Sequence, residues 1–313
     1  MTTVLVTGVT GQDGGYLAER LVAEGCDVHG LVHEGDAHVD QLLARTPSVQ
    51  VHTGDLADAA SLARVVEQVQ PDEVYNLAGV SSVARSWEEP VLTADVCALG
   101  VARLLSVLPR SVRFVQASSA EVFGDAAEAP QTELTPLKPT SPYGVAKVFA
   151  QQQVGLYRSL GMPASSLILY NHESPRRPSA FVTRKITQTV ARIAAGLEDE
   201  LVLGNVSARR DWGWAPDYVD AMIRAARAPE SGDYVIATGE SHTVEEFALA
   251  AFARAGVEPR IRVDASLARP GDPAVLVGDA SKARSVLGWA PTVGFSEIVG
   301  RMVEADLETL GAG

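Results

Sequence analysis

The sequence has few cysteines, few aromatic residues and too little positive charge to balance its acidic residues. Cys26 and Cys97 are the two cysteines in 313 residues, and each lies in an apolar pattern. We interpret both as reduced core residues and expect a cytoplasmic protein without a signal peptide. The formal net charge of −13 argues against nucleic-acid and membrane partners.

Two further absences narrow the possibilities. We expect no apolar run long enough to span a bilayer. His33 and His38 lie close together, but no thiolate or third histidine joins them, so we expect no metal site.

Short apolar strands alternate with helices, and this alternation predicts an α/β protein with a doubly wound parallel sheet. The expected strands cover residues 4–6, 28–32, 51–52, 73–78, 113–117 and 165–169. The expected helices cover residues 61–69, 91–108, 143–160 and 295–307. We assign residues 1–168 and roughly 211–238 to a dinucleotide-binding domain. Residues 169–210 and 239–313 are assigned to a smaller α/β substrate-binding lobe.

A glycine-rich loop follows the first strand. Gly8, Gly11 and Gly14 separate that strand from an amphipathic helix, the arrangement in which a pyrophosphate lies on a helix N-terminus. The loop therefore predicts dinucleotide binding.

The end of the second strand leaves the kind of dinucleotide open. An acidic residue here suits the ribose hydroxyls of NAD, whereas a nearby arginine suits the 2′-phosphate of NADP. Val32 resembles the NADP pattern, Glu34 resembles the NAD pattern, and His33 is ambiguous. Asp55, after the third strand, is placed to meet the adenine.

The stretch 116–147 carries the expected chemistry. Ser119 and Glu121 follow a strand, and Tyr143 and Lys147 share one face of a helix that Ser141 is placed to cap. A free tyrosine phenol titrates near about 10, and the lysine ammonium is expected to lower that pKa. Tyr143 can then act as a base toward a sugar or alcohol hydroxyl, with Glu121 as a second, separate base. The same Tyr–Lys spacing also occurs in ordinary surface helices.

Basic residues gather in the expected smaller lobe. They lie between Arg176 and Arg210 beside proline, glycine and tryptophan rather than at helical spacing, which favours ligand contact over a solvated face. This cluster would attract an anionic substrate despite the overall negative charge.

The chain resembles the GDP-mannose 4,6-dehydratase family of the extended short-chain dehydrogenases/reductases. In family order the matching stretches are TGVTGQDGGYLAE, QPDEVYNLAG, QASSAEVFG, SPYGVAKVFA, NHESPRR, FVTRKIT, LGN, RRDWGWAPDYVDAM, DYVIATGE and GDASKARSVLGW. The resemblance implies a Rossmann-type fold and a redox-neutral dehydration. In that reaction C4 of the sugar is oxidised, water is eliminated across C5 and C6, and the hydride returns to C6 from a tightly bound NADP.

The resemblance also implies roles for individual residues. Those expected to act in catalysis are Ser119, Glu121, Tyr143 and Lys147. Those expected to bind the cofactor are Gly8, Thr10, Gly11, Gln12, Asp13, Gly14, His33, Asp55, Leu56, Leu77, Ala78, Tyr143, Lys147 and His172. Those expected to bind the GDP-sugar are Ser81, Asn171, Thr183, Arg184, Lys185, Asn205, Arg210, Arg269 and Asp272, the last in place of a glutamate.

Some positions depart from the family pattern. His33 and Glu34 replace the usual Arg-Arg and the loop behind them is short, so NAD stays possible beside NADP. Residues 80–83 read VSSV where the family has Gln-Ser-His-Val, so a different sugar stays possible. We expect a homodimer or homotetramer that pairs through helices 91–108 and 143–160. The alternatives are a 4-keto sugar-nucleotide reductase or epimerase, and a dinucleotide-sensing protein without catalysis.

Overall fold

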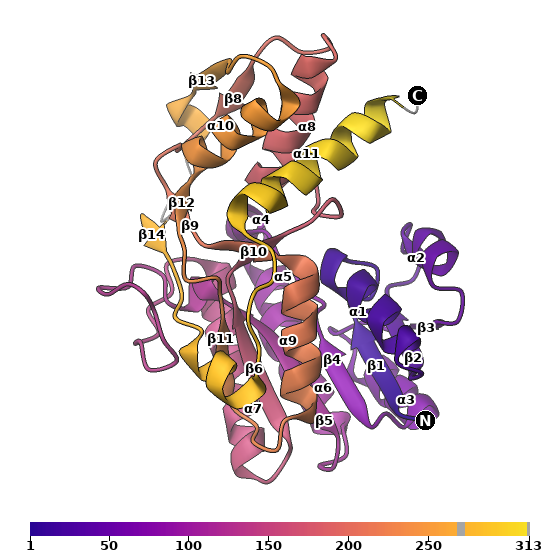
Figure 1. The fold of residues 1–313 in the computed structure, drawn as a ribbon. Coiled ribbons are helices and arrows are strands. Elements are labelled where there is room, and N and C mark those ends of the chain that lie inside the picture. The colour runs from indigo at the N-terminus through magenta and orange to yellow at the C-terminus, as the bar shows by residue number, and fades with distance from the viewer. Residues whose placement is uncertain (268–272, 312–313) are drawn as a thin grey trace.

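The computed structural model describes residues 1–267 and 273–311, and a seven-stranded parallel sheet forms its centre (Figure 1). The strand order is β11-β6-β5-β4-β1-β2-β3. The strands are β1 (Thr3–Thr7), β2 (Asp27–Val32), β3 (Gln50–Thr53), β4 (Glu73–Asn76), β5 (Arg113–Ser119), β6 (Ala164–Leu169) and β11 (Asp233–Ile236). The chain builds outward from β1 to β3 and then crosses back to β4, so the order reverses between β1 and β4. Ligands of such sheets bind at the carboxyl ends of the strands on either side of this reversal.

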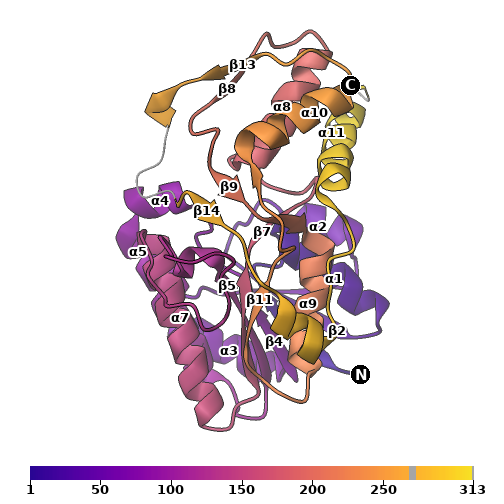
Figure 2. The same cartoon turned by 60° about the vertical axis from the view of Figure 1, so that its left-hand side comes forward.

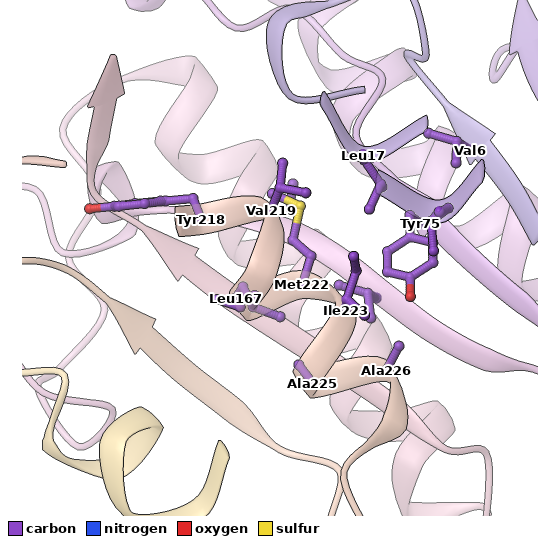
Figure 3. Close-up of a cluster of buried hydrophobic side chains, with 14 of the residues drawn as sticks. Val6, Leu17, Tyr75, Leu167, Tyr218, Val219, Met222, Ile223, Ala225 and Ala226 are labelled. Carbon is purple, nitrogen blue, oxygen red and sulfur yellow. The ribbon is translucent and has the colours of Figure 1, made fainter. Parts of the chain in front are cut away.

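Helices cover both faces of the sheet, which explains why its strands are apolar on both sides. Along β1, Val4 and Val6 enter the core beneath α1 (Gln12–Ala23) and α9 (Ala215–Arg227), whereas Leu5 enters the opposite core. That opposite core is covered by α3 (Ala59–Val69), α6 (Gly100–Val107) and α7 (Pro142–Ser159). Figure 3 shows how α9 places Val219, Met222 and Ile223 toward the sheet.

One helical run differs from the sequence expectation. α5 (Pro90–Ala94), a π-helical turn (Asp95–Leu99) and α6 follow one another without a break. By length and composition alone, Pro90–Val107 could cross a membrane, so the expectation that no such run exists was wrong. Val101, Leu104 and Leu105 are nevertheless buried against the sheet, which identifies the α6 part of the run as a core helix.

A smaller lobe sits above one end of the main domain (Figures 1 and 2). Its core lies between α8 (Val182–Ala194), α10 (Val244–Ala255) and α11 (Phe295–Gly311). Short strand pairs complete it: β7 (Asn171–Glu173) with β10 (Trp212–Trp214), and β8 (Leu201–Leu203) with β13 (Ile261–Val263). β9 (Arg209–Arg210) lies between β12 (His242–Thr243) and β14 (Val275–Leu276).

The predicted fold class is confirmed, with shifts at particular boundaries. The strand expected at 113–117 continues to Ser119, and the helix expected at 143–160 begins at Pro142. The division of the chain into two parts stays a prediction, and one observation stands against its last boundary. Leu287 and Trp289 pack in the core of the main domain, and the Trp289 indole donates to the carbonyl of Asp217 on α9 at 2.7 Å.

Candidate active site

A cleft of about 430 Å³ lies where the carboxyl ends of the main strands meet the smaller lobe. It brings together residues from most of the chain. Predicted site residues among those lining it are Ser119, Glu121, Tyr143, Lys147, Asp13, Leu77, His172, Ser81, Asn171, Thr183, Lys185, Asn205 and Arg210. The four residues expected to act in catalysis therefore share one cavity with most of those expected to bind substrate.

Tight packing between α7 and the end of β5 positions the catalytic group. A 3₁₀ turn (Ala120–Val122) carries Glu121 directly after β5, and the Ser119 hydroxyl accepts from the Glu121 amide at 3.3 Å. Ser141 caps α7, as expected, by accepting from the amide of Gly144 at 3.1 Å. A Cβ atom on Gly144 would lie 2.6 Å from the carbonyl oxygen of Glu121. Only glycine lets α7 approach this closely, and the approach holds Tyr143 near Glu121.

Burial dominates the electrostatics of Tyr143. It raises the pKa of the phenol more than Lys147 and a hydrogen bond with Ser119 lower it. Lys147 therefore acts in the expected direction, but the net pKa of the phenol is raised rather than lowered. Lys147 is buried as well, and its ammonium donates to the carbonyl of Ala117 at 2.8 Å, 5.6 Å from the centre of the Tyr143 ring.

The glycine loop leaves the N-terminus of α1 open. No side chain caps the helix at Gly11, so the amides of the first turn have no side-chain acceptor there. A Cβ atom on Gly14 would lie 2.2 Å from the Gly8 carbonyl, and Gly8 has a φ of +67° against Ala78. These glycines bring the helix end close to the strand ends, and the open amides fit a pyrophosphate.

A buried ion pair joins the first turn of α1 to β7. His172 lies 2.8 Å from Asp13 through its Nε2, and its ring stacks on Tyr218. Burial opposes both charges, yet the partners outweigh it: the pKa of Asp13 is lowered and the pKa of His172 is raised. Gln12 donates to the His172 carbonyl at 3.2 Å and accepts from Ser174 at 2.7 Å. The cofactor loop and the start of the smaller lobe are thus connected.

Two charged residues that line the cleft, Glu173 and Arg177, were not among the predicted binding residues. Glu173 is buried, accepts from the hydroxyl of Thr183 at 2.6 Å and lies 3.3 Å from Arg177. Arg177 in turn lies over the Phe181 ring. Their signal in the sequence was the charged stretch NHESPRR, in which the resemblance singled out only Asn171 and His172.

Other predicted residues lie elsewhere. The side chain of Arg184 forms an ion pair with Asp306 of α11 and is not among the cleft-lining residues, which counts against its predicted role in substrate binding. Gly8, Thr10, Gly11, Gln12, Gly14, His33, Asp55, Leu56 and Ala78 are outside the cleft lining and follow the ends of β1 to β4. Arg269 and Asp272 lie outside the described residues.

A doubly wound sheet, a glycine loop beside its reversal point and a Ser-Glu-Tyr-Lys group in one cleft define an extended short-chain dehydrogenase/reductase. The family model described as GDP-mannose 4,6 dehydratase matches residues 5–302. The chain belongs to this family of hydro-lyases, and the predicted resemblance is confirmed.

Relatives and solved structures agree with this assignment. The chain is 45% identical to GDP-mannose 4,6 dehydratase 1 of Arabidopsis thaliana, over 97% of this chain and 89% of that protein. It is 42% identical to the GDP-mannose 4,6-dehydratase of Yersinia enterocolitica, over 98% and 94% of the two chains. The crystal structure of Thermus thermophilus UDP-glucose 4-epimerase in complex with NAD superposes with a TM-score of 0.85 at 28% identity, covering 97% and 98%.

Proposed function

We propose that this chain converts GDP-mannose, or a close GDP-sugar, to GDP-4-dehydro-6-deoxy-mannose. The observation that carries the proposal is the position of Glu121. It lines the same cleft as Tyr143 and Lys147, on a turn that α7 contacts directly at Gly144. A reductase needs one proton relay, whereas an elimination at C5 and C6 needs a second base, and Glu121 supplies it.

Each residue has a defined task in this reaction. Tyr143 accepts the proton of the sugar O4 as C4 becomes a ketone, and Ser119 hydrogen-bonds the same oxygen. The ketone acidifies C5–H, and Glu121 removes that proton and delivers a proton to the C6 hydroxyl as it leaves as water. A nicotinamide dinucleotide held by the glycine loop and Lys147 would supply the hydride chemistry that the reaction needs at C4 and C6. Lys147, together with the positive charge of an oxidised nicotinamide, favours the Tyr143 phenolate against the effect of burial.

The residues present fit a nicotinamide dinucleotide. The open amides of α1 suit the pyrophosphate, and the glycine loop lets it approach. Lys147 lies beside Tyr143, where the resemblance places it on the cofactor. Solved neighbours hold NAD or NADPH. The family resemblance favours NADP for this chain, while His33 and Glu34 keep NAD open.

The rim of the cleft suits a nucleoside diphosphate sugar. Asn171, Lys185, Asn205 and Arg210 line it, and arginine and lysine suit the diphosphate. The Lys185 ammonium donates to the carbonyl of Val202 at 2.8 Å, which fixes its position in the lobe. Ser81 lines the same cleft and is assigned to the sugar.

Isotope transfer tests the reaction. GDP-mannose with deuterium at C4 should give a product that carries deuterium at C6 of the same molecule, measured by mass spectrometry and NMR. Loss of the label to solvent would refute the proposal. Stoichiometric consumption of added NADPH with a 4-keto sugar nucleotide would instead identify a reductase.

We further propose a homodimer of this enzyme in the cytoplasm. Apolar side chains are exposed on the neighbouring helices α4 (Val83–Glu88), α5 and α7, which lie side by side in Figure 2. They and their flanking residues are Trp87, Val91, Leu92, Leu99, Val145, Phe149, Leu156 and Leu160. Pairing of this surface with its copy would bury them.

A further inference from the structure

The turn that follows β2 is rich in carboxylates and is fixed against the glycine loop. Gly35, with a φ of +74°, lets the chain reverse, and the amide of Asp36 donates to the carbonyl of His33 at 3.2 Å. The hydroxyl of Thr10 donates to Asp36 Oδ2 at 2.8 Å. The His38 amide donates to Asp36 Oδ1 at 2.9 Å, so both oxygens of this carboxylate have protein partners.

A second carboxylate approaches the same turn from β3. The ends of β2 and β3 are joined by the Gly54 amide, which donates to the Val32 carbonyl at 3.0 Å. This places Asp55 with its Oδ2 3.9 Å from the His33 imidazole. Glu34 is exposed at the tip of the turn. Glu34 and Asp36 therefore lie on the turn after β2, where a dinucleotide places its adenine-side ribose, and Asp55 lies beside this turn on the adenine side.

Positive charge is scarce in this region of the sequence, and Arg103 of α6, which donates to the Leu56 carbonyl at 3.2 Å, is paired with Asp95 at 2.6 Å. Between residues 21 and 63, Arg45 is the only lysine or arginine. It is exposed in the last turn of α2 (Val39–Arg45), beyond the turn that carries the carboxylates. A 2′-phosphate would bring about two negative charges to this surface, whereas a ribose diol would donate hydrogen bonds to the carboxylates.

We infer that this enzyme takes NAD rather than NADP, and that the turn formed by residues 33–36 makes the choice. The inference rests on the dinucleotide binding in the proposed function but not on the identity of the sugar. It differs from the NADP that the family resemblance implies. The usual Arg-Arg, which would hold a 2′-phosphate, is replaced by His33 and Glu34, and the carboxylates of this turn repel that phosphate.

Direct binding separates the two dinucleotides. The purified protein would be stripped of nucleotide and titrated calorimetrically with NAD⁺ and NADP⁺. NAD⁺ should bind at least about tenfold more tightly, because repulsion by a few nearby carboxylates exceeds the free energy equivalent of a tenfold ratio. Mass spectrometry of nucleotide that co-purifies with untreated protein should find NAD(H).

Variants locate the discrimination. Asp36→Asn keeps the shape and an acceptor for Thr10 but removes the charge. It should reduce the ratio of NAD⁺ affinity to NADP⁺ affinity at least about threefold, mainly by tightening NADP⁺ binding. Glu34→Arg should narrow it further. Asp40→Asn, an exposed charge removal on α2, is the matched control and should leave the preference unchanged.

Three results would overturn the inference. The first is NADP⁺ binding as tightly as NAD⁺ or more tightly. The second is selective loss of NADP⁺ affinity in Arg45→Ala, which would mean that Arg45 reaches a 2′-phosphate. The third, no binding of either dinucleotide, would refute dinucleotide binding in the proposed function as well.

Discussion

Replacement of Gly144 by alanine should impair the elimination more than it impairs folding. The new methyl would lie 2.6 Å from the Glu121 carbonyl oxygen, about 0.8 Å short of an ordinary 3.4 Å contact. Because the obstacle is backbone, α7 or the 3₁₀ turn must move by most of that amount. Misplacement of about 1 Å at a reacting group can cost about 10²-fold in rate, so we expect kcat to fall roughly 10- to 100-fold.

The expected cost in stability is small by comparison. Overpacking typically costs about 1–3 kcal/mol, and the gain of alanine over glycine within a helix offsets up to about 1 kcal/mol of it. Urea unfolding followed by circular dichroism would measure this change, and product formation at saturating GDP-mannose would measure kcat. A KM close to that of the unmodified enzyme would place the defect in the chemical step.

Gly155 on the same helix provides the control. A Cβ atom there would meet only the end of the Arg158 side chain, at 3.6 Å. Gly155→Ala should therefore leave kcat unchanged and raise the free energy of unfolding by about 0.5–1 kcal/mol. Full activity in Gly144→Ala would show that the contact between α7 and the turn does not position the catalytic group.

Three other predictions concern separate parts of the molecule. Glu121→Gln should slow dehydration about 10²- to 10⁴-fold in an assay of 4-keto product, and a smaller loss would exclude Glu121 as the base. His172→Gln leaves the partly buried Asp13 without its cation, although Gln12 still donates to it, and should lower the free energy of unfolding by about 2 kcal/mol. The pKa of Asp13 is lowered and that of His172 is raised, so the pair loses its stabilising effect as acid protonates Asp13 or base deprotonates His172. The difference in free energy of unfolding between this variant and the wild type should therefore be largest between pH 3.8 and 6.5. The same difference at every pH would contradict this prediction. Leu156→Asp on α7 should give monomers by light scattering whereas Leu249→Asp on α10 should not, and equal masses for both would argue against the proposed dimer surface.

The main sheet was predictable because its signals are local. Val4 and its neighbours form an apolar run, and Gly8 and Gly14 mark the turn that must follow it. The helix cap at Ser141 was likewise predictable, because capping depends on one residue and the amide three positions later.

The errors came from contacts between distant segments. The pKa of Tyr143 depends on how deeply the fold buries the side chain. Neither its spacing from Lys147 nor the neighbouring sequence predicts that burial. Arg184 was expected at the substrate because its neighbours are, but its partner Asp306 lies on the last helix. Trp289 likewise packs in the main domain through a contact with α9, which is distant in the sequence, and no local pattern predicts this contact.

The ion pair between Asp13 and His172 couples binding of the dinucleotide to binding of the GDP-sugar. The amides that would receive a pyrophosphate belong to the same helical turn as Asp13, and His172 belongs to the strand from which Asn171 faces the cleft. Any molecule that favours the ordered form of this turn stabilises the folded chain by mass action. An enzyme that has lost its dinucleotide in purification should consequently bind GDP-sugars poorly. Adding the dinucleotide back should restore the affinity for GDP-sugars.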